Sequence, residues 1–181
     1  MLKIYAMETG GADRHETART LLRWKYEELW QRTMPEILLD ENGKPHFGQE
    51  DCHFSISYTG GWVFCALSDS RIGLDAEKIR AVSTNAVNGV LSQKEWVQYS
   101  VSSNPTECFM QLWTLKEAFC KFTGLGIAKT KLNEVSFDLA DDMPRLVGNP
   151  DLFFWSLLCD GISVSACSDF WHRPEMEIIE I

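Results

Sequence analysis

Residues 72–78 read Ile-Gly-Leu-Asp-Ala-Glu-Lys, and this stretch decides how the rest of the chain is interpreted. If it is a β-strand, its side chains alternate between two faces, so Asp75 and Glu77 point to the same side. The strand would then carry a pair of neighbouring carboxylates.

A second stretch, residues 113–121, reads Trp-Thr-Leu-Lys-Glu-Ala-Phe-Cys-Lys. On a helix, Trp113, Glu117 and Lys121 are spaced i, i+4 and i+8, so they form one stripe of an aromatic ring, a carboxylate and an ammonium group. Three carboxylates and a lysine can therefore meet between the strand and the helix. Such an oxygen-rich set suits a hard cation such as Mg²⁺, which binds carboxylates, waters and substrate phosphates, so we expect phosphoryl chemistry.

Each of these features also has an ordinary structural explanation. An Asp-x-Glu pair on an exposed strand is often only solvated. A Glu–Lys pair at i, i+4 is usually a surface ion pair that contributes about 0.3–0.5 kcal/mol. Trp113 is typical of a hydrophobic core. The motifs therefore have to be weighed together.

The composition bounds the class of protein. With 181 residues, of which 45% are hydrophobic, the chain can bury a core as one compact body. A formal net charge of -9, without a run of lysines or arginines, argues against a nucleic-acid partner. The six cysteines form no CxxC pair and are interpreted as reduced core thiols of a cytoplasmic protein. We expect no membrane segment and no export signal, because no stretch is long and apolar enough.

The first part of the chain predicts a strand, a helix and a hairpin. Residues 2–7 alternate as in a strand, and apolar residues recur at helical spacing between residues 13 and 34. Residues 54–58 and 62–67, separated by two glycines, are expected to pair as a hairpin.

The second part predicts two helices followed by strands. Ser92-Gln-Lys-Glu95 is a capping box that starts a helix, and Asn104-Pro105 begin a longer helix that ends near Gly124. Three further segments are expected to be strands, with an Asp-Gly turn between the last two: residues 135–139, 152–159 and 162–167.

This order of elements predicts an α+β fold class. It allows two similar α+β halves with antiparallel strands that pack together. We assign residues 1–71 to an N-terminal half, and residues 72–181 to a C-terminal half that carries both acidic motifs.

Four motifs together resemble those of the 4'-phosphopantetheinyl transferases of the monomeric Sfp type. They are, in chain order, Gly43-Lys-Pro45, Phe54-Ser-Ile-Ser57, Ile72-Gly-Leu-Asp-Ala-Glu77 and Trp113-Thr-Leu-Lys-Glu-Ala-Phe-Cys-Lys121. Any one of them arises by chance, but their ordered occurrence over most of the chain carries the resemblance. The resemblance implies the 4'-phosphopantetheinyl transferase fold, a pseudo-dimer of two similar α+β halves with the active site in the cleft between them.

The same resemblance implies a transferase that moves the 4'-phosphopantetheine arm of coenzyme A onto a serine hydroxyl of an acyl or peptidyl carrier protein. The reaction releases adenosine 3',5'-bisphosphate and depends on Mg²⁺. The implied partners are coenzyme A and a carrier protein of fatty acid, polyketide or nonribosomal peptide biosynthesis. The implied state is a monomer.

Residue by residue, the resemblance makes Asp75, Glu77 and Glu117 the metal ligands, because a bridging cation holds the phosphates in line for attack. Glu117 is also the implied general base toward the carrier serine, directly or through a water. Lys121 corresponds to a lysine near the phosphates, where it neutralises the leaving group. Lys116 lies on another side of the helix and is expected at the surface or at the rim of the substrate site.

Other residues are implied in coenzyme A binding. Arg14, Arg19 and Thr20 match basic and polar positions on the first helix, and arginine suits phosphate because its planar group donates two hydrogen bonds at once. Lys44 and Pro45 belong to the Gly-Lys-Pro turn that faces the nucleotide.

The segment around Ser57 departs from the family. Ser57 matches a serine that bonds a phosphate oxygen, but Tyr58 stands where the family usually has a histidine. A tyrosine hydroxyl donates a hydrogen bond and brings no positive charge. The lysines expected before the first helix are also absent. Both changes predict weaker or altered coenzyme A binding.

The carrier-binding surface has two interpretations. Because the chain and carrier proteins are both acidic, net charge cannot drive docking, and local contacts must do so. The segment after the second motif forms either an apolar patch rimmed by lysines, or core phenylalanines with only the lysines exposed: Phe119, Phe122, Leu125 and Ile127 with Lys116, Lys129 and Lys131.

Two other functions remain open. One is a non-catalytic relative that binds coenzyme A or carrier proteins without turnover, which the intact acidic set argues against. The other is a metal-dependent phosphodiesterase that uses water in place of the serine, which lacks any histidine-rich or two-metal signature in this sequence.

Overall fold

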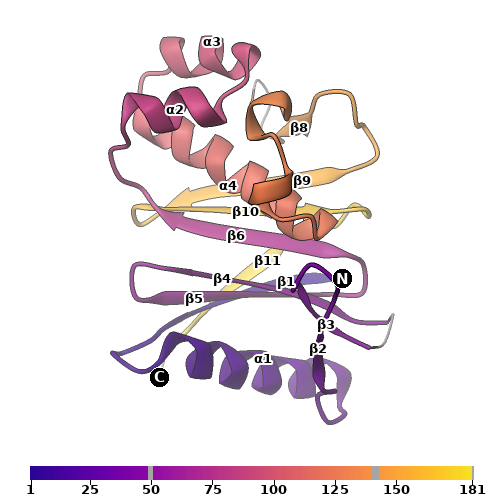
Figure 1. The fold of residues 1–181 in the computed structure, drawn as a ribbon. Coiled ribbons are helices and arrows are strands. Elements are labelled where there is room, and N and C mark those ends of the chain that lie inside the picture. The colour runs from indigo at the N-terminus through magenta and orange to yellow at the C-terminus, as the bar shows by residue number, and fades with distance from the viewer. Residues whose placement is uncertain (49–50, 140–142, 181) are drawn as a thin grey trace.

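The computed structural model of the protein describes residues 1–48, 51–139 and 143–180. Two main sheets lie face to face, and each is covered on its outer side by a long helix, so the layers follow one another as helix, sheet, sheet and helix (Figure 1). None of the described helices combines the length and the hydrophobicity needed to cross a membrane.

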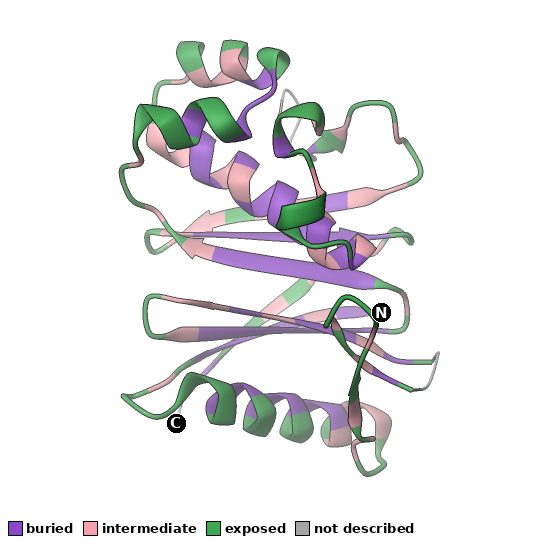
Figure 2. Ribbon diagram, in the orientation of Figure 1, coloured by how far each residue is buried: buried purple, intermediate pink, exposed green. Residues whose placement is uncertain are grey.

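The N-terminal layers consist of one helix on a four-stranded sheet of order β11-β1-β5-β4. Leu21, Leu22 and Tyr26 lie on one face of the helix and are fully buried against this sheet. The opposite face of the helix is exposed (Figure 2). The elements are β1 (Leu2–Glu8), α1 (Arg14–Trp30), β4 (His53–Thr59), β5 (Trp62–Ser68) and β11 (Glu175–Ile179).

The C-terminal layers consist of a three-stranded sheet of order β6-β10-β9 and the helices that cover it. The central helix contributes most of the buried residues of this core, among them Leu112, Leu115 and Ala118. The elements are β6 (Ile72–Lys78), α2 (Thr84–Val90), α3 (Gln93–Val101), α4 (Pro105–Thr123), β9 (Phe153–Cys159) and β10 (Ile162–Ser168).

Shorter elements complete the described chain. They are β2 (Ile37–Leu39) paired with β3 (Pro45–Phe47), β7 (Phe137–Asp138) paired with β8 (Arg145–Leu146), and the 3₁₀ turns η1 (Ile127–Lys129) and η2 (Leu132–Glu134). The β2–β3 pair matters for function, because the turn between its strands lies against the C-terminal end of α4.

The neighbouring edges of the two sheets are joined by hydroxyl groups. Ser55 Oγ on β4 accepts a hydrogen bond of 2.9 Å from the backbone of Leu74 on β6, and Thr59 Oγ1 accepts one of 2.8 Å from the backbone of Lys78. Since alternate residues of a strand share one face, three hydroxyls of β4, including that of Ser57, point toward β6. They set the position of the acidic strand relative to the first sheet.

The predicted helix boundaries are mostly confirmed. Ser92 and Glu95 form the predicted capping box of α3, and α4 begins after Asn104 and ends at Gly124, which adopts a left-handed φ of 74°. The first helix is shorter than predicted: it ends at Trp30 and not at residue 34, because Gln31 adopts a left-handed φ of 51° and stops it.

Two predictions about strands were wrong or incomplete. The strand expected at residues 135–139 is reduced to Phe137–Asp138. The strand β11 was not predicted, and it pairs in parallel with β1, whereas the other described pairings are antiparallel. A segment of the C-terminal half therefore completes the sheet of the N-terminal half, and the boundary between residues 71 and 72 stays a prediction.

The six cysteines are free thiols, and all but Cys159 are buried, as expected of reduced core residues. In Cys65, which lies fully inside the first core, burial raises the pKa of the thiol well above its usual value. A thiol in such a place acts as a small hydrophobic side chain.

Candidate active site

The acidic strand β6 is buried over most of its length (Figure 2). Asp75 lies at its middle and is only 4% exposed. Its Oδ1 accepts hydrogen bonds of 2.8 Å from Ser57 Oγ on β4 and 2.8 Å from Lys121 Nζ on α4. Its Oδ2 is buried and has no hydrogen-bond partner among the described residues. A buried carboxylate oxygen without a partner is costly, which marks this atom as one built to receive a donor or a cation.

Glu77 lies on the same face of β6 as Asp75 and nearer to solvent. Thr59 Oγ1 donates a hydrogen bond of 3.2 Å to its carboxylate. Burial raises the pKa of Glu77, and the negative charge of Asp75 raises this pKa further. The two carboxylates therefore form a pair on one face of the strand, as the sequence motif predicted.

Glu117 comes from the middle of α4 and is 8% exposed. Its pKa is raised to about 7, first by burial and then by the charge of Asp75, while Lys121 lowers it and Glu77 raises it. These mutual effects mean that the three predicted carboxylates lie within electrostatic reach of one another. At neutral pH, Glu117 can accept or release a proton.

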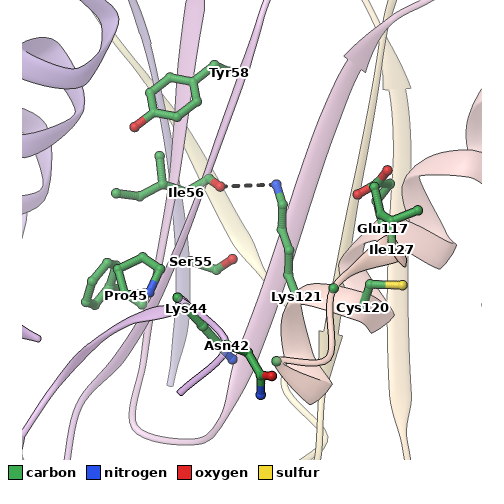
Figure 3. Close-up of a pocket in the computed structure, with 14 residues that line it drawn as sticks. Asn42, Lys44, Pro45, Ser55, Ile56, Tyr58, Glu117, Cys120, Lys121 and Ile127 are labelled. Atoms are coloured by element: carbon green, nitrogen blue, oxygen red, sulfur yellow. Dashed lines mark hydrogen bonds between the residues drawn. The ribbon is translucent and has the colours of Figure 1, made fainter. Parts of the chain in front are cut away.

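Lys121 connects the helix to both sheets. In addition to its ion pair with Asp75, its ammonium group donates a hydrogen bond of 3.1 Å to the carbonyl oxygen of Ile56 on β4 (Figure 3). About 31% of its side chain is exposed, so it can also reach a ligand.

A cavity of about 370 Å³ opens in front of these groups. In Figure 3, Glu117 and Lys121 approach it from α4, while Ser55, Ile56 and Tyr58 line it from β4. Its floor comes from the turn between β2 and β3 and from the loop after α4. The remaining lining residues are Asn42, Gly43, Lys44, Pro45, Phe54, Cys120, Gly124, Gly126 and Ile127.

The donor set fits a divalent cation in its chemistry. Asp75 offers a partnerless Oδ2, and Glu77 and Glu117, both with raised pKa values, are two further carboxylates within its electrostatic reach. Their oxygens are not yet arranged as a coordination sphere, because no group of three His, Cys, Asp or Glu side chains within the described chain is close enough to hold a metal ion. Which residues bind the metal therefore stays a prediction.

The residues expected to bind the nucleotide are only partly gathered at the cavity. Pro45 and Tyr58 line it, and Lys44 lines it with its ammonium group bonded at 3.2 Å to the carbonyl oxygen of Phe122, in the last turn of α4. Ser57 is buried and bonded to Asp75, so its hydroxyl does not face the open cavity.

The residues from the first helix fall into two groups. Arg14 holds its guanidinium 5.4 Å from the centre of the Tyr58 ring, and His15 packs edge-on against the same ring. Arg19 is exposed and lines a separate hollow, and Thr20 is exposed without lining the cavity. Of the three residues predicted on this helix, Arg14 contacts a cavity residue, Tyr58.

The expectation for Lys116 was wrong. This residue is 0% exposed, forms an ion pair of 2.7 Å with the equally buried Glu95, and donates hydrogen bonds to the carbonyl oxygens of Val90, Leu132 and Val135. It therefore ties α4 to the segments around it and cannot touch a substrate. The prediction considered only the position of Lys116 around the helix. It did not consider that the long side chain of a lysine can reach buried carbonyl groups of neighbouring segments.

The structure also decides between the two interpretations of the segment that follows the second acidic motif. Lys116 and Phe122 are buried and Phe119 is partly buried, whereas Leu125 and Ile127 are exposed beside the exposed Lys129 and Lys131. The interpretation with core phenylalanines is thus confirmed for the phenylalanines, but it was wrong that only the lysines are exposed, because Leu125 and Ile127 are exposed and Lys116 is buried.

Several residues that contribute to the site were not predicted from the sequence. Thr59 and the carbonyl group of Ile56 bond to Glu77 and Lys121, and Thr114 lies in a buried hydroxyl cluster behind the site. Ile56 and Thr114 lay inside recognised motifs, but no role was predicted for either. These contacts depend on which elements lie side by side, and no local pattern reveals that.

Comparison with known proteins shows which family the chain resembles. Residues 71–169 match the family model of the 4'-phosphopantetheinyl transferase superfamily. The chain is 30% identical to the 4'-phosphopantetheinyl transferase gsp of Aneurinibacillus migulanus, over 78% of this chain and 62% of that protein. It is 33% identical to the 4'-phosphopantetheinyl transferase Sfp of Bacillus subtilis strain 168, over 61% of this chain and 50% of that protein.

The chain thus spans between half and two thirds of these curated relatives. Among solved structures, a holo-[acyl-carrier-protein] synthase of Thermotoga maritima superposes with a TM-score of 0.48 at 20% identity, covering 54% of this chain and 61% of that one.

Proposed function

The chain belongs to the 4'-phosphopantetheinyl transferase superfamily, and we propose that it transfers the 4'-phosphopantetheine arm of coenzyme A to a serine hydroxyl of an acyl or peptidyl carrier protein. The observation that carries this proposal is the position of Glu117 and Lys121, which line one cavity. Lys121 also pairs with Asp75, and the charges of Asp75 and Glu77 raise the pKa of Glu117. We further propose that the protein acts as a monomer in the cytoplasm, where both substrates are made.

The reaction is a substitution at the β-phosphorus of coenzyme A. The serine oxygen forms a new bond to this phosphorus, and the bond from the phosphorus to the bridging oxygen of the diphosphate breaks. The products are the phosphopantetheinylated serine and adenosine 3',5'-bisphosphate. Catalysis of such a step depends on placing the reactants in line and on stabilising charge on the phosphate oxygens.

Asp75, Glu77 and Glu117 are the proposed ligands of a Mg²⁺ ion, which would supply positive charge to the diphosphate. The partnerless Oδ2 of Asp75 supports this assignment. Lys121 can leave its contacts with Asp75 and Ile56 to neutralise the leaving phosphate, since part of its side chain is exposed. Glu117 is the proposed acceptor of the serine proton, directly or through a water. Its pKa of about 7 holds for the site without metal, and a bound cation would lower it.

The cavity is proposed to hold the nucleotide end of coenzyme A. Lys44 and Pro45 line it, and Arg14 approaches it beside Tyr58. Ser57 is proposed to act through Asp75, to which it donates a hydrogen bond, more than through a phosphate. Arg19 and Thr20 are exposed on α1 and can contribute only at the outer edge of the ligand.

The test is an intact-mass assay of a panel of apo carrier proteins incubated with the protein, coenzyme A and Mg²⁺. A gain of one phosphopantetheine mass on a carrier is expected, and Glu117→Ala should abolish it. Absence of any mass shift across fatty acid, polyketide and peptide carriers would sink the proposal. Calorimetry with coenzyme A then identifies the alternative, a non-catalytic relative, by binding without product.

A further inference from the structure

Helix α4 is fixed on the second sheet at two places, and Glu117 lies between them. The first place is Gly73 on β6, where the helix backbone comes so close that a Cβ atom would lie 2.0 Å from the carbonyl oxygen of Ala118 and 2.4 Å from the backbone nitrogen of Phe122. Only a glycine permits this approach. The helix cannot move toward the strand at this end.

The second place is a cluster of buried hydroxyl groups one turn before Glu117. Thr114 Oγ1 lies 2.9 Å from Ser163 Oγ and 2.8 Å from Ser165 Oγ on β10. All three residues are 0% exposed. Ser165 Oγ donates a further hydrogen bond of 3.1 Å to Ser156 Oγ on β9. Each hydroxyl has one proton, so with Ser163 donating to Thr114, the proton of Thr114 is shared between Ser165 Oγ and the carbonyl oxygen of Gln111, which lies 3.1 Å away on the same helix.

The two serines that Thr114 contacts lie directly across from the acidic pair. In the pairing of β10 with β6, Ser165 is opposite Asp75 and Ser163 is opposite Glu77. Opposite residues of an antiparallel pair carry their side chains on the same face of the sheet. Thr114 is therefore bonded to the strand positions that are the nearest neighbours of the two carboxylates.

The position of Thr114 on the sheet also fixes the positions of Glu117 and Lys121, because all three belong to helix α4. Thr114 and Glu117 are three residues apart and Lys121 is seven residues after Thr114, so all three lie on one side of α4. A helix rises about 1.5 Å per residue, so Glu117 is about one turn from the anchored hydroxyl. A slide or rotation of α4 along β10 would move Glu117 relative to both carboxylates of β6.

We propose that Thr114 is a positioning residue, whose hydrogen bonds to Ser163 and Ser165 set the place of Glu117 over Asp75 and Glu77. This inference rests on the proposed function, since it concerns the carboxylates that are proposed to bind the metal. The apolar core around α4 cannot do this alone, because hydrophobic contacts are not directional and tolerate small shifts. Hydrogen bonds between buried hydroxyls are directional and are lost when the helix moves.

The test compares two substitutions at Thr114 by Mn²⁺ binding, measured by electron paramagnetic resonance on the whole protein. Thr114→Val keeps the shape and removes the hydroxyl, and it should weaken Mn²⁺ binding by about tenfold, as expected for a residue behind a ligand shell. Thr114→Ser keeps the hydroxyl and should bind Mn²⁺ as tightly as the wild type. Equal affinity of the valine variant and the wild type would overturn the proposal, as would failure of the serine variant to restore binding.

A matched control separates positioning from stability. Ser92→Ala removes the side-chain cap of α3 and a partly buried hydrogen bond of 2.8 Å to Ser136, in the same half of the protein and away from the cavity. It should lower the melting temperature as Thr114→Val does and leave the Mn²⁺ affinity unchanged. If both variants weaken Mn²⁺ binding equally, the effect of Thr114 is only structural and the proposal fails.

A metal-free measurement keeps this inference apart from the proposed function. If the wild-type protein bound no Mn²⁺ and modified no carrier, the proposed function would fail. Crystal structures of the wild type and of Thr114→Val without metal would still decide the inference. The carboxylate of Glu117 should be displaced relative to Asp75 and Glu77 in the variant, and an unchanged position would refute the positioning role.

Discussion

Lys121 Nζ lies 2.8 Å from Asp75 Oδ1, and this ion pair joins the helix of the second motif to the strand of the first. The same carboxylate keeps its second oxygen buried and without a partner among the described residues. The pair thus leaves one of the two oxygens of Asp75 without a partner in the described part of the chain. Asp75 and Lys121 therefore hold strand and helix together and also have proposed roles in the reaction.

Replacing Lys121 by methionine tests this double role. The variant should lose roughly 100-fold in transfer rate, as expected when one charge-stabilising donor is removed. It should also lose about 1–3 kcal/mol in the free energy of unfolding, because Asp75 stays buried without its cation. The partial exposure of Lys121 to solvent keeps this loss below that of a fully buried pair. Urea unfolding and the carrier mass assay measure the two effects. Lys131→Met, at an exposed pair with Glu134, is the control and should change neither.

The pKa of Glu117 predicts how stability depends on pH in the absence of metal. Because this pKa is raised from 4.5 to about 7 in the folded protein, folding takes up a proton between these values. The contribution of Glu117 to stability is therefore fully present below about pH 4.5 and is lost as the pH rises through about 7.

Glu117→Gln removes this dependence. At pH 8, with a chelator present, the glutamine variant should be more stable than the wild type by up to about 3 kcal/mol, and the difference should shrink toward pH 5. Mg²⁺ should stabilise the wild type at pH 8 and leave the variant unchanged. Unfolding curves at the two pH values check this, and a gap that stays constant with pH would contradict it.

Gly73→Ala tests the close approach of α4 to β6. The new Cβ would meet backbone atoms of Ala118 and Phe122 that cannot rotate away. We expect a loss of about 2–4 kcal/mol in unfolding free energy and loss of transfer activity, since the helix must shift. Gly89→Ala in α2 is the matched control: a Cβ there meets nothing within 4 Å, so the variant should be as stable as the wild type or more so.

Lys116→Met tests the buried ion pair with Glu95. The substitution leaves Glu95 buried without its cation and removes the donor to three carbonyl oxygens. We expect a loss of about 3–5 kcal/mol in unfolding free energy. Because Lys116 does not reach the cavity, the folded fraction of the variant should keep the wild-type KM for coenzyme A. A raised KM at a temperature where the variant is folded would show that Lys116 contacts the substrate.

Much of the fold was accessible from local patterns. The capping box at Ser92, the Asn104-Pro105 start of α4 and its glycine end at Gly124 were predicted because each depends on a few neighbouring residues. The strand β11 was missed because its place depends on β1, which lies more than 160 residues away in the chain. The end of α1 was misplaced because the left-handed conformation of Gln31 carries no strong sequence signal.

The sequence by itself determined the local arrangement of the candidate site. The alternation of a strand brings Asp75 and Glu77 to one face, and the period of a helix aligns Trp113, Glu117 and Lys121, because both repeats are properties of the backbone alone. Only the tertiary structure decided how these groups are used. It buried Lys116 against Glu95, turned Ser57 toward Asp75, and set Thr114 on Ser163 and Ser165. These contacts join segments far apart in the chain, and their energies depend on burial and on the direction of hydrogen bonds, neither of which exists until the layers have packed.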